Sequence, residues 1–147
     1  MRFRIVYLTA ITGFFFDQIS KAISRHYLVT QSVDFGVIRF DLVFNKGAAW
    51  GIFSDHTQVL TFLGVAAIAF LLYSLRDLVK TKMDSVAVGC LLAGALGNTF
   101  DRLLFGRVTD FINIHILPVF NVADMLLNCG ILLIILQSIL DYMRRKA

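Results

Sequence analysis

Residues 122–142, VADMLLNCGILLIILQSILDY, form an apolar run that is long enough to cross a membrane as a single helix. A bilayer core of about 30 Å needs about 20 apolar residues per helical span. The run nevertheless opens with two polar side chains, Asn121 just before it and Asp124 inside it. Because polar groups are unfavourable at membrane depth, the fold and the use of these two residues have to be explained together.

Three further apolar runs precede this one, from Ile5 to Ile23, from Val59 to Leu75 and from Val86 to Phe105. Of the 147 residues 58% are hydrophobic and only 16% are charged, and the mean hydropathy is +0.76. This balance excludes an ordinary water-soluble domain. We predict an all-α membrane protein, a bundle of four transmembrane helices that forms one domain over residues 1–147.

The distribution of basic residues predicts the orientation of this bundle. Four spans put both termini on one side, and eight of the 14 basic residues then fall on that same side. By the positive-inside rule this side is cytoplasmic. No basic stripe with interleaved aromatic residues is left over, so nucleic acid binding is not expected. The eight residues are Arg2, Arg4, Arg76, Lys80, Lys82, Arg144, Arg145 and Lys146.

Two segments outside the apolar runs have the alternating pattern of a half-buried strand. Residues 38–44 read IRFDLVF and residues 112–116 read INIHI, with apolar side chains at every second position. This period of two is typical of strands. We expect a small β element on the outer, periplasmic side of the membrane, with a pair of extended loops as the alternative.

Three acidic residues are expected at one level within the outer third of the membrane. At a rise of about 1.5 Å per residue, Asp17 lies about 18 Å and Asp101 about 22 Å above the cytoplasmic starts of their helices. The fourth helix descends from outside, which puts Asp124 about 3 Å below the outer boundary. Lys21 follows Asp17 by four residues, so these two can pair on one helix face. The first run carries both charges and lacks a small-residue cleavage pattern, so a mature helix is expected rather than a signal peptide.

Two facing aspartates can work as a catalytic pair. Two carboxylates at close range cannot both ionise, so one holds a proton while the other activates water, as in aspartic proteases. A small proton-coupled or lipid-binding membrane protein could use the same acids for binding. The sequence shows no inverted repeat or broken helix, and the acids lie towards one face rather than at the midplane, which favours the protease.

The motifs that carry these residues resemble those of the bacterial lipoprotein signal peptidases, also called signal peptidase II. The resemblance covers nearly the whole chain, with Ser20, Trp50 and Ala95 as minor departures. The matching stretches are DQISK at 17–21, NKGAAWG at 45–51, GALGNTFDR at 94–102 with Gly106, Val108, Asp110 and Phe111 after it, and PVFNVAD at 118–124.

The resemblance implies an inner-membrane aspartic endopeptidase that removes the signal peptide from diacylglyceryl-modified prolipoproteins, just before the lipidated cysteine. By similarity, Asp101 and Asp124 are expected to be the catalytic pair. No metal or organic cofactor is implied. The implied partners are prolipoproteins, membrane lipids and inhibitors of the globomycin type, and a monomer is expected.

Supporting roles are expected for Asp17, Lys21, Asn45, Gly47, Asn98, Arg102 and Asn121. Asn98 and Asn121 each precede an acid by three residues, so each could orient a carboxylate, bind substrate backbone or cap a helix. Arg102 is expected to bind a headgroup phosphate or an outer carboxylate such as Asp110. The segment 45–51 is expected to close over the site as a lid.

Overall fold

The computed structural model describes residues 1–47 and 56–146, which form five helices and three strands. Residues 48–55, which hold most of the expected lid and Trp50, lie outside the described residues. The helices are α1 (Arg2–Tyr27), α2 (Thr57–Tyr73), α3 (Leu75–Leu78), α4 (Lys82–Phe105) and α5 (Val122–Lys146). The strands are β1 (Val33–Asp34), β2 (Arg39–Asn45) and β3 (Val108–Asn113).

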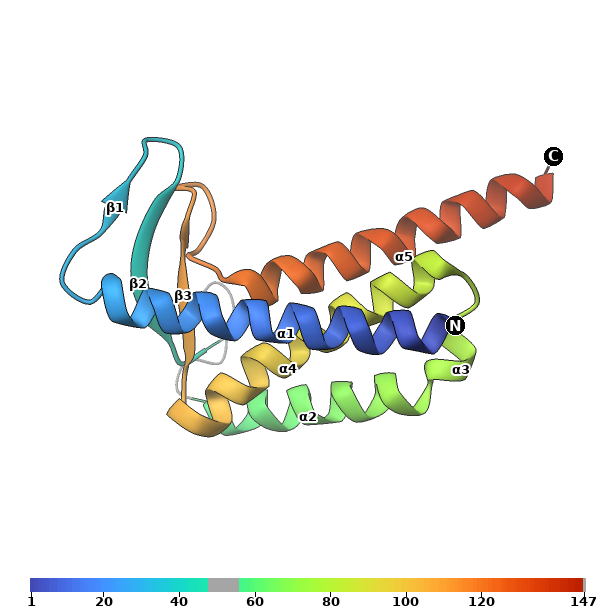
Figure 1. The fold of residues 1–147 in the computed structure, drawn as a ribbon, viewed down its shortest axis with the longest axis horizontal. Helices are drawn as coiled ribbons and strands as arrows, with labels where there is room; N and C mark the ends of the chain where they lie inside the picture. Colours follow the sequence, from blue (N-terminus) through green and yellow to red (C-terminus); the bar gives the residue numbers. More distant parts are fainter. Residues whose placement is uncertain (48–55, 147) are drawn as a thin grey trace.

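Helix α4 is the central element of the bundle, and it contacts α1, α2 and α5. The four long helices coincide with the four predicted apolar runs, and Figure 1 shows them running lengthwise through the molecule. The two termini and α3 lie at one end of the bundle, while the three strands lie across the other end (Figure 1). The predicted combination of a helical bundle with a small β element is therefore confirmed.

The bundle buries many polar and charged side chains beside a small apolar core that includes Val6, Val88 and Leu92, and its outer surface is apolar. The largest fully buried side chains include Lys21, Asp17, Asp101 and Asn121, whereas Leu, Ile and Phe residues on all four long helices are exposed. This reverses the arrangement of a water-soluble protein and suits an apolar solvent, where polar groups have to find partners inside the protein. Among the described residues, α4 and α5 are long and apolar enough to cross a membrane, and α2 is apolar but shorter.

Local sequence signals fix both ends of α4. Thr81 and Asp84 form a capping box, in which the Asp84 N–H donates to Thr81 Oγ1 and the Thr81 N–H donates to Asp84 Oδ2. The helix therefore begins before Val86, where the apolar run begins. It ends at Gly106, whose φ of 65° is the left-handed conformation that glycine adopts most easily.

Two glycines on α4 allow its neighbours to approach closely. A Cβ at Gly97 would collide with the Asp17 carboxylate of α1, and a Cβ at Gly94 would collide with the Ala123 carbonyl oxygen of α5. The start of α5 and the polar part of α1 are thus held directly against α4. This packing brings together side chains from three helices at the end of the bundle next to the sheet.

The strands form an antiparallel sheet in the order β1, β2, β3, with Val43 opposite Asp110 and Asn45 opposite Val108. The second predicted strand, 112–116, is displaced from the observed β3. The chain leaves the strand after Asn113, because Asn113 Oδ1 accepts the His115 N–H at 2.8 Å and His115 has a φ of 67°. Asp110 consequently lies inside a strand, and its position there is fixed by the register with β2.

Candidate active site

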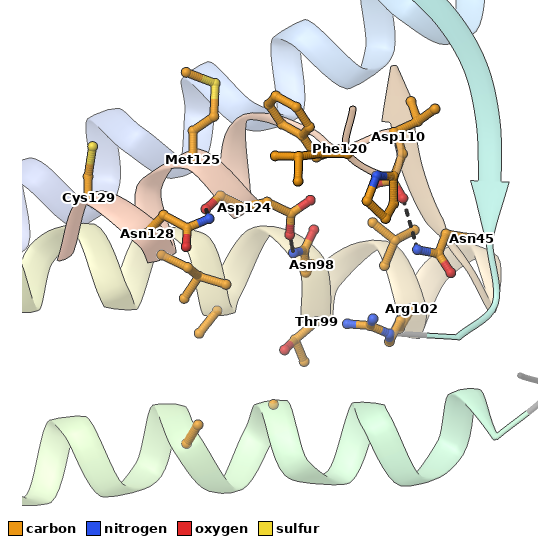
Figure 2. A pocket seen from close by; sticks show the side chains of 18 of the residues that line it. Asn45, Asn98, Thr99, Arg102, Asp110, Phe120, Asp124, Met125, Asn128 and Cys129 are labelled. Carbon is orange, nitrogen blue, oxygen red and sulfur yellow. Dashed lines mark hydrogen bonds between the residues drawn. The ribbon is translucent and has the colours of Figure 1, made fainter. Parts of the chain in front are cut away.

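A pocket of about 1010 Å³ opens between α2, α4, α5 and the sheet. Two carboxylates line it, Asp110 from β3 and Asp124 from the first turn of α5. Figure 2 shows both acids beside the pocket, with the amide side chains of Asn45 and Asn98 bonded to them. Leucines, alanines and Val43 make up much of the remaining wall, so the two acids meet in a largely apolar site.

Asp124 is held by the start of its own helix. Asn121 is the residue before α5, and its side-chain Oδ1 accepts the Asp124 N–H at 3.0 Å. In return the Asn121 N–H donates to Asp124 Oδ2 at 3.1 Å, which makes a reciprocal cap. The other oxygen, Oδ1, accepts Asn98 Nδ2 at 2.8 Å. Asp124 therefore sits at the positive end of the α5 dipole.

Asp110 is enclosed by the sheet and is only 2% exposed. Its two oxygens accept amide protons from Asn121 Nδ2 at 2.6 Å and from Asn45 Nδ2 at 3.0 Å. Burial, together with the negative charge of Asp124, raises the pKa of Asp110 to about 6. The two acids thus differ in environment, and Asp110 keeps its proton to a higher pH than a free aspartate does.

The Asn98 amide is bonded to Asp124, and Lys21 fixes the orientation of this Asn98 amide. Its Oδ1 accepts both Lys21 Nζ at 3.0 Å and Asn121 Nδ2 at 3.1 Å. Since both partners are donors, the oxygen has to face them, and Nδ2 is left to donate to Asp124. Asn98 and Asn121 therefore both orient carboxylates, and Asn121 is a helix cap as well.

Asp101 lies in a separate buried group with Asp17 and Lys21. Lys21 Nζ is 2.9 Å from Asp17 Oδ2 and 3.7 Å from Asp101 Oδ2, and all three side chains are fully buried. The predicted pairing of Asp17 with Lys21 is thus present. The second Asp17 oxygen accepts the Ala123 N–H at 2.8 Å, which ties α1 to the start of α5.

The expectation that Asp101 faces Asp124 in one site is not met. Asp101 accepts the Thr109 N–H at 2.9 Å, and Arg25 Nη1 lies 3.7 Å from its Oδ1. It is fully buried and is not among the residues that line the pocket. Its side chain turns to the cations of α1, Lys21 and Arg25. Asp110 lines the pocket with Asp124 instead.

Arg102 and Gly47 meet at the edge of the pocket. Arg102 Nη2 donates to the Gly47 carbonyl oxygen at 3.2 Å, and Arg102 lines the pocket. No ion pair between Arg102 and Asp110 is found within residues 1–47 and 56–146, and the alternative contact with a headgroup phosphate stays a prediction. The guanidinium therefore helps to hold the end of β2 and its turn beside the two acids.

Asp110 was missed as a site residue because it lies outside the apolar runs. Polar residues at membrane depth lie on the helices, whereas Asp110 reaches the site from a strand. One signal was available in the sequence. The stretch VTDFIN has an acid at a strand position and follows GNTFDR within a few residues, so it lies on the same side as the end of the third run.

This arrangement is suited to acid and base catalysis on a substrate in the pocket. Two carboxylates with unlike environments can divide one proton between them, so that one serves as the acid and the other as the base. Their hydrogen bonds come from asparagine amides and a backbone N–H, which orient the oxygens without neutralising either charge. Among the described residues, the carboxylates that line the pocket are those of Asp110 and Asp124.

Comparisons with known proteins agree on one family. The sequence profile described as "Signal peptidase (SPase) II" matches residues 9–140. A lipoprotein signal peptidase from Synechocystis sp. is 34% identical over 148 residues, covering 93% of this chain and 89% of that protein.

Two solved structures share the fold. Both are bacterial membrane enzyme structures determined by the in meso method, one at 2.3 Å and one at 1.9 Å resolution. The first has a TM-score of 0.83 and 34% identity, and the match covers 93% of this chain and 88% of the chain in that structure. The second has a TM-score of 0.81 and 33% identity, and covers 90% and 91%. Sequence, fold and site geometry together show that the chain belongs to the signal peptidase II family.

Proposed function

We propose that this protein removes the signal peptide from diacylglyceryl-modified prolipoproteins, with Asp110 and Asp124 as the catalytic acids. The observation that carries the proposal is the pocket itself. Within the described residues these are the two carboxylates that line it, and both are bonded to amides rather than to cations. Family membership supplies the reaction, and the related lipoprotein signal peptidase supplies the substrate class.

The two acids take different roles in the proposed mechanism. Asp124 is the ionised base, because it caps α5 and the helix dipole favours its negative charge. Asp110 is the protonated acid, because burial and the charge of Asp124 both oppose its ionisation. Asp124 removes a proton from a water molecule as the water attacks the scissile carbonyl carbon. Asp110 gives its proton to the carbonyl oxygen, which produces a tetrahedral diol.

Collapse of this diol completes the reaction. Asp124 now carries the proton that it took from water, and it passes that proton to the departing amine as the C–N bond breaks. Asp110 takes a proton back from the diol as the new carboxyl group forms, so the pair returns to its starting state. Asn45 and Asn98 keep one oxygen of each acid in place through these transfers.

The proposed topology has four spans, with both termini in the cytoplasm and the site near the outer face of the inner membrane. It is supported by the position of the basic residues, since the starts of α1 and α4 and the end of α5 lie at one end of the bundle (Figure 1). The sheet lies at the other end (Figure 1), and the two acids belong to β3 and to the first turn of α5. A membrane-bound substrate would then meet the acids where water also has access.

The walls of the pocket suit a lipid-modified substrate. Leu63 and Ala67 of α2 face the pocket from one side, and Leu127 and Leu132 of α5 from another. These side chains can pack against the apolar signal segment or the diacylglyceryl chains. We expect globomycin-type inhibitors to occupy the same pocket, because they are cyclic peptides that take the place of substrate in this family.

The test is a cleavage assay with the purified protein. A synthetic diacylglyceryl prolipopeptide and its unlipidated counterpart are incubated with the protein in detergent, and the products are identified by mass spectrometry. The proposal predicts a single cut before the lipidated cysteine, with the unlipidated peptide cut much more slowly. An intact lipidated peptide, in a preparation whose folding is shown by a cooperative melt, would contradict it.

A further inference from the structure

Asn128 of α5 is a polar residue that has no part in the mechanism above. It is exposed, follows Asp124 by four residues and lines the same pocket. It lies about 9 Å along α5 from Val122, which is within the hydrocarbon in the proposed topology. An exposed amide at that depth is unfavourable unless it meets a polar partner. This points to a ligand that supplies one.

The protein itself uses only part of this amide. Nδ2 donates one proton to the Asp124 carbonyl oxygen at 2.9 Å. No residue in the described part of the chain donates to Oδ1. Figure 2 shows Asn128 on the pocket side of α5, with its amide oxygen directed away from Asp124. One acceptor and one donor proton therefore remain, and together they are the complement of a single peptide unit.

A substrate cut at Asp110 and Asp124 would bring such a peptide unit. This step rests on the proposed function. A signal peptide crosses the membrane as a helix, but its backbone has to be extended where it is cut, which frees N–H and C=O groups. In an apolar site each of them needs a new partner. The apolar side chains that line the pocket, such as Ala67 and Leu132, cannot provide a hydrogen bond.

Spacing identifies the peptide unit. Four residues along a helix correspond to about 6 Å. An extended chain covers that distance in about two residues, at about 3.3 Å each. Asn128 lies deeper than Asp124 in the proposed topology, and the signal peptide approaches from that direction. We propose that Asn128 is a substrate-binding residue, which pairs with the backbone of the signal peptide about two residues before the cleaved bond.

The first experiment compares Asn128→Leu with a matched control. Ser138 lies on the same helix, outside the described lining of the pocket, and its Oγ donates to the Ile134 carbonyl oxygen at 2.9 Å. Ser138→Ala therefore removes a similar bond within the helix and nothing else. With the diacylglyceryl prolipopeptide, Asn128→Leu should lower kcat/KM about five- to tenfold, which is the scale of one hydrogen bond. Ser138→Ala should leave kcat/KM unchanged.

The second experiment removes the partner from the substrate. In a series of prolipopeptides, one amide at a time is replaced by an ester along the residues before the cut, which deletes one N–H donor. For the wild type, the ester about two residues before the cut should lower kcat/KM by a similar factor. For Asn128→Leu the same ester should cost nothing further, because the partner of that N–H is already missing.

The outcomes separate this inference from the proposed function. If Asn128→Leu cleaves as fast as the wild type, or if no ester in the series slows the wild type, the inference is wrong. The ester series with the wild type does not depend on the folding of any variant. If the wild type cleaves none of these peptides, the proposed function fails instead.

Discussion

The protein holds two groups of carboxylates on either side of Asn98, and they differ in what surrounds them. In one group Asp17 and Asp101 share the buried cation Lys21. In the other, Asp110 and Asp124 are bonded to asparagine amides and backbone N–H groups. A buried acid paired with a buried cation forms a contact between elements, so it holds helices together. An acid held only by amides keeps a proton equilibrium that chemistry can use.

Asn98 joins the two groups and also keeps them apart. Its Oδ1 faces Lys21 and its Nδ2 faces Asp124, at 3.0 and 2.8 Å. The cation therefore fixes the orientation of the amide, while the amide and not the cation is bonded to Asp124. We infer that Lys21 stabilises the fold and orients the site. We also infer that Asp110 and Asp124 can exchange a proton only because Asn98 stands between Lys21 and Asp124.

The largest expected effect comes from changing the base. Asp124→Asn keeps the size of the side chain but removes the negative charge that activates water. We expect kcat to fall by about 10³-fold or more, the scale seen when a catalytic group is lost. The measurement is cleavage of the lipidated peptide, with binding of globomycin as the check on folding. Cleavage within tenfold of the wild type would contradict the assignment of Asp124.

The next effect concerns the group of Asp17, Asp101 and Lys21, where a substitution should change stability most. Lys21→Met leaves Asp17 and Asp101 buried without their shared cation. Removing one partner of a buried ion pair costs about 3–5 kcal/mol of unfolding free energy. Thermal unfolding in detergent measures this loss.

A surface ion pair gives the control for Lys21. Arg39 Nε lies 2.7 Å from Asp41 Oδ1, and Arg39 is 42% exposed. Exposed pairs contribute about 1 kcal/mol or less, so Arg39→Gln should hardly shift the melt. Equal losses for Lys21→Met and Arg39→Gln would contradict the special contribution of the buried Lys21 to stability.

A third prediction uses the pH dependence of stability. The pKa of Asp110 is raised from 3.8 to about 6 in the folded protein. Between these values the folded state holds a proton that the unfolded state has released, so stability falls as pH rises. The contribution of Asp110 is present below about pH 4 and lost above about pH 6, and it amounts to roughly 3 kcal/mol.

Asp110→Asn should remove this part of the pH dependence. Relative to the wild type, the melting temperature of Asp110→Asn should rise as pH goes from 4 to 7, because the variant has no charge to bury. Melts of both proteins across this range provide the measurement. Parallel curves would mean that Asp110 titrates normally and would weaken its assignment as the acid.

The smallest expected effect is on the orientation of Asp110. Asn45 Nδ2 donates to Asp110 Oδ2, so Asn45→Ala should lower kcat by about tenfold, the cost of one oriented hydrogen bond to a charged or reacting group. Asn113 is the matched control, since its Nδ2 donates to Asp41 Oδ2 at 2.8 Å in the same sheet. Asn113→Ala should keep kcat. Equal effects of the two variants would point to a general weakening of the sheet.

Much of the fold could be predicted because the helices obey simple rules. Four apolar runs of membrane length became α1, α2, α4 and α5, and the glycine after the third run marks its end. The strands were harder to place. The pattern of 112–116 continues past Asn113, but a side-chain bond to the His115 N–H ends the strand there, and apolar alternation carries no information about such a bond.

The candidate site could be predicted only in part. Asp124 and its cap by Asn121 follow from the sequence of a helix start, and the pairing of Asp17 with Lys21 follows from their spacing. Which of Asp101 and Asp110 lines the pocket with Asp124 does not follow from the sequence. Depth along a helix says at which level a residue lies, but not whether its side chain turns to Lys21 and Arg25 or to the pocket. That choice depends on the register of β3 with β2, which is a tertiary feature.

The most direct test of this account compares Asp110→Asn with Asp101→Asn in the cleavage assay. Both replace a buried carboxylate with its amide, and globomycin binding shows which preparations are folded. We predict that Asp110→Asn loses cleavage by about 10³-fold or more while its stability at pH 7 is kept or raised. We predict that Asp101→Asn is less stable, but that its folded fraction cleaves within about tenfold of the wild type. An inactive Asp101→Asn beside an active Asp110→Asn would contradict the account.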